Sequence, residues 1–143
     1  MRLLITALLL ATSTLLAQSL PEVTVYKSKF CGCCGMWTKH MEDNGFKVKT
    51  IITEDMNTVK KNFDIPSHLS SCHTAIIGEY LVEGHTPASD IKAFLKNPPQ
   101  GARGLTVPGM PIGSPGMEQG DIKQPYKVYA FTKDNRVAVF AEH

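Results

Sequence analysis

The sequence predicts an α/β fold in which a central mixed sheet is flanked by helices. Two observations indicate this class of fold. Strand-like and helix-like segments follow one another in the order strand, helix, strand, helix, β-hairpin, helix, and a Cys-x-Cys-Cys motif stands between the first strand and the first helix. This order is that of the thioredoxin-like fold, which keeps a reactive dithiol at the same strand-to-helix turn, usually as Cys-x-x-Cys.

The amino-terminal residues have the composition of a secretory signal peptide. Residues 1–17 carry one charge, at Arg2, and their apolar stretch, residues 3–10, is shorter than a membrane span requires. We therefore expect a signal peptide over residues 1–19 and one thioredoxin-like metal-binding domain over residues 20–143. The protein is accordingly predicted to be periplasmic, with no membrane span after cleavage.

The net charge argues against a nucleic-acid partner. The formal charge is +2 at pH 7, and loss of Arg2 with the signal peptide leaves +1. The basic residues do not cluster along the chain. A charge this small, spread evenly, does not favour binding to a phosphate backbone.

The first half of the predicted domain pairs each strand with a helix. Residues 23–26 are β-branched or aromatic in the way a strand requires. The cysteine motif then opens a helix, whose large residues recur at three- and four-residue spacing within residues 36–44 and which Gly45 is suited to end. A second strand is expected at residues 46–52 and a second helix at residues 55–63.

A β-hairpin and a third helix are predicted next. Residues 73–77 and 80–83 have the composition of two strands, and residues 78–79 form the turn between them. Thr86 is suited to cap a helix over residues 87–95, which begins with a proline. This helix completes the order of elements described above.

Residues 98–120 are predicted to form a long irregular loop. They contain five of the nine prolines and six of the eleven glycines. A loop of this length is usually functional or mobile, so we expect a lid or a flap. Two turns in it place Met110 and Met117 seven residues apart. Residues 126–132 and 136–140 then alternate as a terminal hairpin at the sheet or its edge would.

The spacing of the four cysteines favours metal binding over structural disulfides. Cys31, Cys33 and Cys34 fall within four residues, whereas Cys72 stands alone. Structural disulfides, usual in exported proteins, are the less favoured alternative, because adjacent or closely spaced cysteines bridge with strain or close a very small loop. At a helix start the Cys31 thiol should ionise readily. Cys34 can close a disulfide with Cys31 or share a metal, and Cys33 supplies a third sulfur that a redox dithiol does not need.

Cys72 stands where thioredoxins usually carry a cis-proline, which shields the reactive sulfurs from metals. In the predicted sheet the third strand runs antiparallel to the first, so its beginning lies beside the cysteine motif and Cys72 should face Cys31. The fourth strand ends at the same edge and should bring residues 83–85 to the site. His73 and His85 are therefore further candidate ligands, although structural roles explain them equally well.

Thiolates, imidazoles and thioethers together form a soft ligand set. Such a set favours Cu(I) over hard cations, and a third thiolate that can bridge favours more than one ion. Met110 and Met117 are the candidate thioethers, although packing of the loop explains them at least as well. Zinc is a less favoured alternative, because structural zinc sites usually present paired Cys-x-x-Cys motifs.

The remaining histidines and the tryptophan are assigned roles outside the site. We expect His40 to face solvent, although it shares a helical face with Met36. His68 and His143 have no evident partners in the sequence and are expected at the surface. Trp37 is expected to pack in the core behind the cysteine motif.

Four segments carry a resemblance to a known family. They are Tyr26-Lys27-Ser28 leading into Cys31-Gly32-Cys33-Cys34-Gly35, then Ser71-Cys72-His73-Thr74-Ala75, Val82-Glu83-Gly84-His85, and the loop from Val107-Pro108-Gly109-Met110-Pro111 to Gly116-Met117-Glu118. On these residues the chain closely resembles the CopG-type copper-resistance proteins, a group long catalogued as a domain of unknown function. The resemblance covers nearly all of the mature chain. It implies a thioredoxin-like fold, a periplasmic location and a cysteine-bridged copper cluster at Cys31, Cys33, Cys34 and Cys72.

The sequence thus predicts a periplasmic copper-binding protein of copper resistance. It is expected to hold Cu(I) in a cysteine-bridged cluster, to interconvert copper redox states, and to work with other periplasmic copper-handling proteins. The alternative is a thiol–disulfide oxidoreductase that uses Cys31 and Cys34. A third hypothesis is a passive metal sponge or chaperone without turnover.

Overall fold

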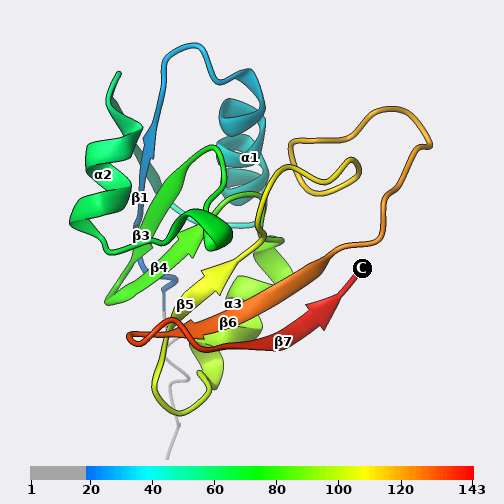
Figure 1. The fold of residues 1–143 in the computed structure, drawn as a ribbon. Helices are drawn as coiled ribbons and strands as arrows, with labels where there is room; N and C mark the ends of the chain where they lie inside the picture. Colours follow the sequence, from blue (N-terminus) through cyan, green and yellow to red (C-terminus); the bar gives the residue numbers. More distant parts are fainter. Residues whose placement is uncertain (1–18) are drawn as a thin grey trace, which may run out of the picture.

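The computed structural model of the protein describes residues 19–143. Apart from its last residue, the predicted signal peptide lies outside this range. A single seven-stranded sheet runs through the molecule in the order β2-β1-β3-β4-β5-β6-β7 (Figure 1). The elements are β1 (Val23–Lys27), α1 (Gly32–Asp43), β2 (Val48–Ile52), α2 (Met56–Asn62), a 3-10 turn η1 (Ser67–Leu69), β3 (Thr74–Ile77), β4 (Tyr80–Glu83), α3 (Ala88–Lys96), β5 (Ala102–Thr106), β6 (Lys127–Thr132) and β7 (Val137–Glu142).

The predicted order of elements and the predicted strand directions are confirmed. β1 pairs in parallel with β2 and antiparallel with β3, and β3 pairs antiparallel with β4. The end of β1, the start of β3 and the end of β4 therefore lie at one edge of the sheet. The segments that carry the cysteine motif, Cys72 and His85 meet at that edge.

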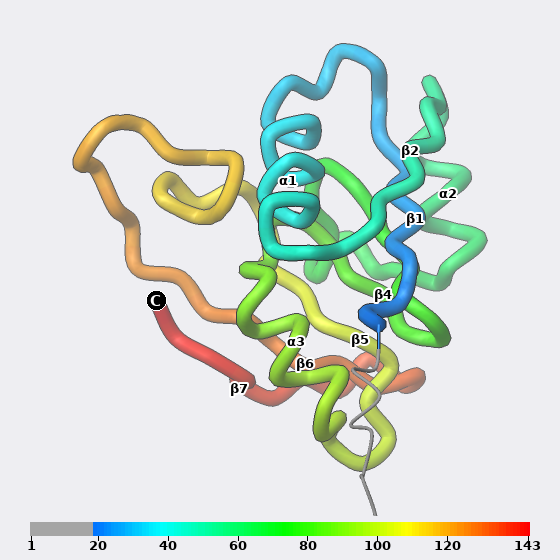
Figure 2. The backbone as a smooth tube through the Cα atoms, turned by 180° about the vertical axis from the view of Figure 1, so that it is seen from behind, coloured from blue at the N-terminus to red at the C-terminus, as the bar shows by residue number. Residues whose placement is uncertain are grey.

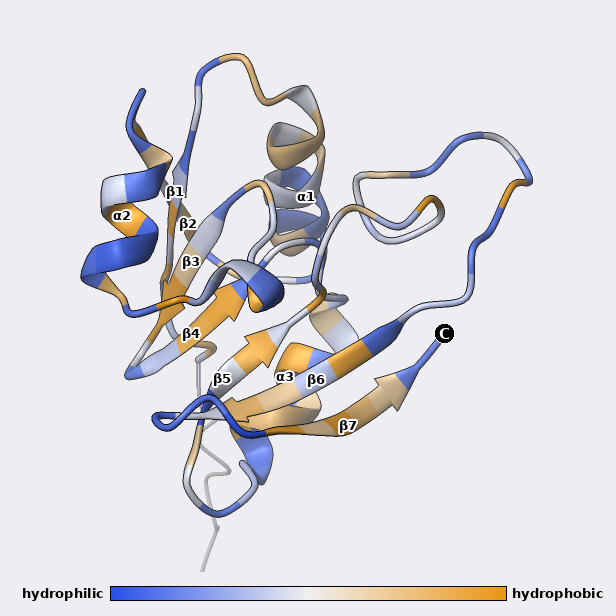
Figure 3. Ribbon diagram, viewed as in Figure 1, coloured by the Kyte–Doolittle hydropathy of each residue, from blue (hydrophilic) through white to orange (hydrophobic). Residues whose placement is uncertain are grey.

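Helices cover both faces of the sheet, as expected. α1 and α3 lie on one face and α2 lies on the other (Figures 1 and 2). Residues alternate between the two faces along each strand: Val82 of β4 faces the larger core with Trp37 and Phe94, whereas Leu81 faces the smaller core with Phe131. The central strands are mainly hydrophobic and α2 is mainly hydrophilic (Figure 3), so the core is built from the sheet together with the buried side chains of α1 and α3.

The prediction of an irregular loop over residues 98–120 is wrong for its first part, which forms strand β5. This strand pairs in parallel with β4 and antiparallel with β6. A Cβ atom on Gly104 would lie 1.9 Å from the carbonyl oxygen of Leu81. The glycine that made the segment look irregular thus permits the close approach of β5 to β4, and it also lies at an irregularity in the pairing of β5 with β6. The terminal hairpin is confirmed, and its strands β6 and β7 complete the sheet.

Two predictions about the start of α3 are wrong. Pro87, with extended backbone, is the N-cap residue, so Thr86 lies outside the helix and its hydroxyl points to the Glu83 carbonyl. The Ala88 amide instead donates to Nε2 of His40 at 3.0 Å. His40 is half-buried rather than solvent-facing because its ring satisfies this free amide at the helix start.

Within residues 19–143, no helix has both the length and the apolar character of a membrane span.

Candidate metal centre

The start of α1 gathers three of the four cysteines. Cys31 is the N-cap residue, and Cys33 and Cys34 lie in the first turn of the helix. Cys34 is fully buried, while Cys31 and Cys33 are half-buried. Trp37 fills the core one turn later and donates from Nε1 to the Thr86 carbonyl at 2.8 Å, which confirms its predicted role.

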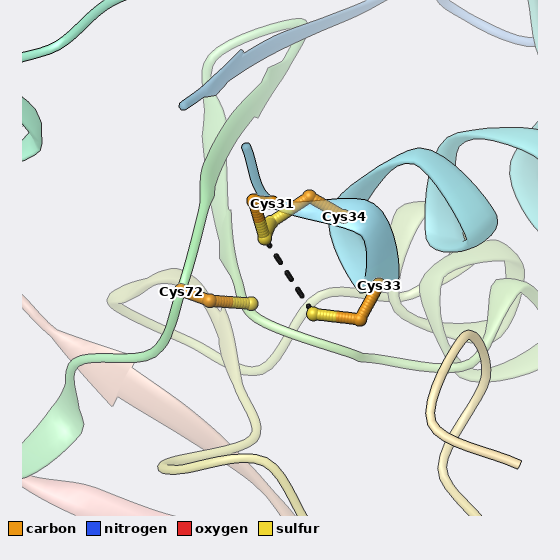
Figure 4. A group of neighbouring side chains, drawn as sticks. All are labelled: Cys31, Cys33, Cys34 and Cys72. Carbon is orange, nitrogen blue, oxygen red and sulfur yellow. Dashed lines mark hydrogen bonds between the residues drawn. A yellow bond between two sulfur atoms is a disulfide. The ribbon is translucent and has the colours of Figure 1, made fainter. Parts of the chain in front are cut away.

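Cys72 completes the cluster from a distant part of the chain. It lies in the turn before β3, and its sulfur points toward the sulfurs of α1 (Figure 4). The four sulfurs all lie within 4.8 Å of one another. The predicted meeting of Cys72 with the cysteine motif is therefore confirmed.

Two of the four cysteines are oxidised. A disulfide joins Cys31 to Cys34, whose Cα atoms are 5.3 Å apart, and Cys33 and Cys72 are free thiols. The sulfur of Cys33 lies 3.5 Å from that of Cys31 (Figure 4). The spacing of Cys31 and Cys34 allowed either a disulfide or a shared metal. The structure has the disulfide, and this disulfide belongs to the cluster of four sulfurs.

Two buried histidines contact Cys72. Nε2 of His85 lies 2.9 Å from the Cys72 sulfur, and its Nδ1 lies 2.7 Å from the carbonyl oxygen of Pro115. Because a carbonyl only accepts, Nδ1 carries the proton and Nε2 presents its lone pair to the sulfur. Nδ1 of His73 lies 3.4 Å from the same sulfur. Nε2 of His73 is buried and has no hydrogen-bond partner among the described residues.

Burial controls the protonation of this group. It raises the pKa of the Cys72 thiol to about 12, and the neighbouring Cys33 adds to the shift. It lowers the pKa of His85, and it holds the pKa of His73 well below the usual value. At neutral pH the imidazoles are neutral and Cys72 is a thiol, so a metal ion must displace its proton. Neutral imidazoles and a displaceable thiol suit a soft cation.

The end of the loop lies against α1 and does not stand away from the site. A Cβ atom on Gly116 would lie 2.8 Å from both the carbonyl oxygen of Cys33 and the amide nitrogen of Trp37. Met117 follows this contact and is partly buried, whereas Met110 is half exposed. The roles of Met110 and Met117 as thioether ligands stay predictions.

His68 and His143 lie at the surface as predicted, but His143 has partners that were not predicted. His68 is exposed. His143 is exposed too, but its Nε2 lies 2.7 Å from a carboxylate oxygen of Asp90 and its ring stacks on Tyr126. Sequence reasoning missed both partners because they lie far from it in the chain.

A buried carboxylate, that of Glu83, lies beside the cluster; the sequence placed residues 83–85 at the site but gave Glu83 no role. Glu83, the last residue of β4, is fully buried and accepts from the Ser71 amide at 2.7 Å and from the Thr74 hydroxyl at 2.6 Å. The Lys60 ammonium pairs with the same carboxylate. Burial raises the pKa of Glu83, and Lys60 opposes that shift. A charged residue at the end of an otherwise apolar strand was the signal available in the sequence.

The fold and the site together define a mixed α/β protein with a cluster of soft metal-binding side chains at one edge of its sheet. A family described as "Protein of unknown function, DUF411" matches residues 69–117, which include Cys72, His73 and His85. Two solved structures of copper resistance protein CopG, forms 2 and 1, are 42% and 43% identical to this chain, with TM-scores of 0.81 and 0.80. Each match covers 86% of this chain and 98% of the other. The chain therefore belongs to the CopG family of copper resistance proteins. No curated protein matches the sequence.

Proposed function

We propose that this protein binds Cu(I) as its cargo through the thiolates of Cys31, Cys33, Cys34 and Cys72. The observation that carries the proposal is the convergence of four sulfurs, from two distant segments, to within 4.8 Å of one another. Sulfurs this close can bridge neighbouring soft ions, which supports a cluster of more than one copper. Membership of the CopG family supports copper as the metal.

The non-sulfur ligands follow from the residues around Cys72. His85 offers the lone pair of Nε2 beside the Cys72 sulfur. Nδ1 of His73 lies near the same sulfur, and its buried Nε2 has no hydrogen-bond partner within residues 19–143. We infer that these imidazoles complete the coordination when copper is bound. Met110 and Met117 are the candidates for thioether ligands from the loop.

Loading of copper on all four cysteines requires reduction of the disulfide. Two electrons and two protons convert the bond between Cys31 and Cys34 into two thiols, and copper then displaces the thiol protons. A thiol reductant can supply the electrons. The disulfide form retains only Cys33 and Cys72 as thiols, so it should hold less copper.

The proposal extends to the setting of the protein. Residues 1–19 are proposed to be a signal peptide that directs the chain to the periplasm, and residues 20–143 a single domain of thioredoxin-like fold. There the protein would exchange copper with other copper-handling proteins. Interconversion of copper redox states is the further activity proposed for the cluster.

Copper stoichiometry tests the proposal. Reduced protein loaded with Cu(I) without oxygen should hold more than one copper per chain, and Cys72→Ser should hold fewer. His68→Ala, which changes an exposed residue outside the cluster, is the matched control and should load like the parent. Equal copper loading of Cys72→Ser and the parent would refute the four-sulfur site.

A thiol–disulfide oxidoreductase is the second candidate, and the bond between Cys31 and Cys34 favours it. This activity needs only those two sulfurs, so Cys33→Ser should leave disulfide exchange intact. If that variant exchanges disulfides as fast as the parent and copper changes neither rate, the enzyme is the better account. A passive carrier is separated from a copper-interconverting protein by testing whether bound copper changes oxidation state with an electron donor.

A further inference from the structure

The turn that carries Cys72 is held from β4 and from the segment after β5. The Gly84 amide donates to the His73 carbonyl at 3.1 Å, and the Gly109 amide donates to the Ser70 carbonyl at 3.2 Å. The Ser71 hydroxyl donates to the Gly109 carbonyl. The cluster needs its fourth sulfur at a defined place, and these contacts make the turn rigid around it.

A single side chain anchors the middle of this turn. The Glu83 carboxylate accepts from the Ser71 amide, one residue before Cys72, and from the Thr74 hydroxyl, two residues after it. It therefore forms hydrogen bonds to the chain on both sides of the cysteine. Within residues 19–143, the side chains grouped closely enough to hold a metal ion are Cys72, His73, His85 and the α1 cysteines, and Glu83 is not among them.

A fully buried carboxylate is costly unless several donors satisfy it. Glu83 has three donors, including the Lys60 ammonium, whose side chain is only 13% exposed. An apolar residue would bury the same strand end without this cost. The buried charge is therefore explained by its hydrogen bonds to the turn that carries Cys72.

We propose that Glu83 is a positioning residue, which fixes the Cys72 sulfur against the sulfurs of α1 through its bonds to Ser71 and Thr74. Its importance for copper rests on the function proposed above. Its effect on the position of the sulfur does not depend on copper.

A disulfide equilibrium measures that position directly. In a Cys31→Ser, Cys34→Ser chain the remaining thiols are Cys33 and Cys72. Oxidised glutathione converts this dithiol into a protein disulfide and releases two glutathione thiols, so the equilibrium reports the effective concentration of one protein thiol at the other. Circular dichroism and thermal unfolding follow the fold in parallel.

Three substitutions in that chain give the comparison. Glu83→Leu should lower the effective concentration roughly tenfold or more, because the Ser71 amide loses its acceptor. Glu83→Gln should lower it less, because its amide oxygen can still accept from Ser71. Glu79→Leu, at the exposed turn of the same hairpin, is the control and should leave it unchanged.

An effective concentration in folded Glu83→Leu within about twofold of the Glu79→Leu value would overturn the proposal. If Glu83→Leu does not fold, Thr74→Val removes one donor alone, and an unchanged value there would overturn it as well. Copper loading of the four-cysteine chain separates the two proposals. A parent that binds no copper refutes the proposed function, while a fall in effective concentration still supports the positioning role.

Discussion

Cys72 has surroundings that a solvent-exposed thiol lacks. It is half-buried, it lies beside Cys33, and its sulfur contacts the lone pair of His85. Burial stabilises the protonated thiol, so without metal Cys72 is a poor nucleophile although it is close to the other sulfurs.

Alkylation of the disulfide form tests this state. A pKa of about 12 means that the thiolate population at pH 8 is about a thousandfold below that of an ordinary cysteine. A high-pKa thiolate is more nucleophilic, which offsets part of this decrease. We expect iodoacetamide to modify Cys72 at least roughly tenfold more slowly in the folded protein than in denaturant. Peptide mapping by mass spectrometry measures the rate at Cys72, and equal rates in the two conditions would contradict a buried thiol.

His40 gives the protein a pH dependence of stability. Burial lowers the pKa of His40 below 6.5, with Glu118 and Asp43 opposing the shift and Lys92 adding to it. The unfolded chain therefore binds a proton at a higher pH than the folded chain. The stabilisation is fully present above about pH 6.5 and is lost as the pH falls toward the folded pKa.

A comparison of the parent with His40→Gln tests this at residue scale. Between pH 7.5 and 5 the free energy of unfolding should fall less in His40→Gln than in the parent. The other buried histidines, His73 and His85, also have lowered pKa values, but both chains share them. Denaturant unfolding at each pH gives the change in the free energy of unfolding with pH for both proteins. An identical pH dependence in the two would contradict a contribution from His40.

At residue scale, the sequence predicts that the cysteines meet, but it does not predict which side chains bond to the backbone around them. The direction of β3 is enough to bring Cys72 to the cysteine motif, because strand directions follow from the order of elements. The pairing of His40 with the Ala88 amide depends on where α1 and α3 pack, which no local pattern encodes. Residues 83–85 were placed at the site, but the role of Glu83 was missed for the same reason, since its partners Ser71 and Lys60 come from other elements.

At the scale of elements, the loop after β5 is part of the site. The Pro115 carbonyl accepts a hydrogen bond from Nδ1 of His85, and Gly116 packs on the backbone of α1. Because the loop contacts both His85 and α1, it orients the His85 ring relative to the cysteines of α1.

Gly116→Ala tests this contact. Its Cβ would lie 2.8 Å from two backbone atoms at a φ of +88°, so the loop must move away from α1. We expect a loss of about 1–3 kcal/mol in the free energy of unfolding beyond that of the control, and lower copper loading. Gly120→Ala is the matched control, because φ there is also positive but no atom lies within 4 Å of the added Cβ. Equal losses in the two variants would show that the packing of Gly116 has no special importance.

Elements with a regular sequence pattern could be predicted. Elements whose bounds depend on contacts with another element could not. α1 and β3 follow from spacing and composition. β5 did not, because Gly104 is there for the approach of Leu81 and not for any preference of its own segment. The start of α3 was misplaced because its free amide is satisfied by His40 of another helix.

At the scale of the whole molecule, the sheet is what assembles the cluster. The parallel pairing of β1 with β2 and the antiparallel pairing with β3 send the chain back to the same edge. The mixed α/β architecture could be predicted from the order of elements. The bond between Cys31 and Cys34 could not, because the spacing allows both a disulfide and a shared metal.

The most direct test of the four-sulfur site is a crystal structure of the reduced protein loaded with Cu(I), with anomalous diffraction recorded at the copper edge. The account predicts anomalous peaks between the Cys72 sulfur and the sulfurs of Cys31, Cys33 and Cys34. Copper bound only to the α1 cysteines, with the Cys72 sulfur outside bonding distance, would contradict it.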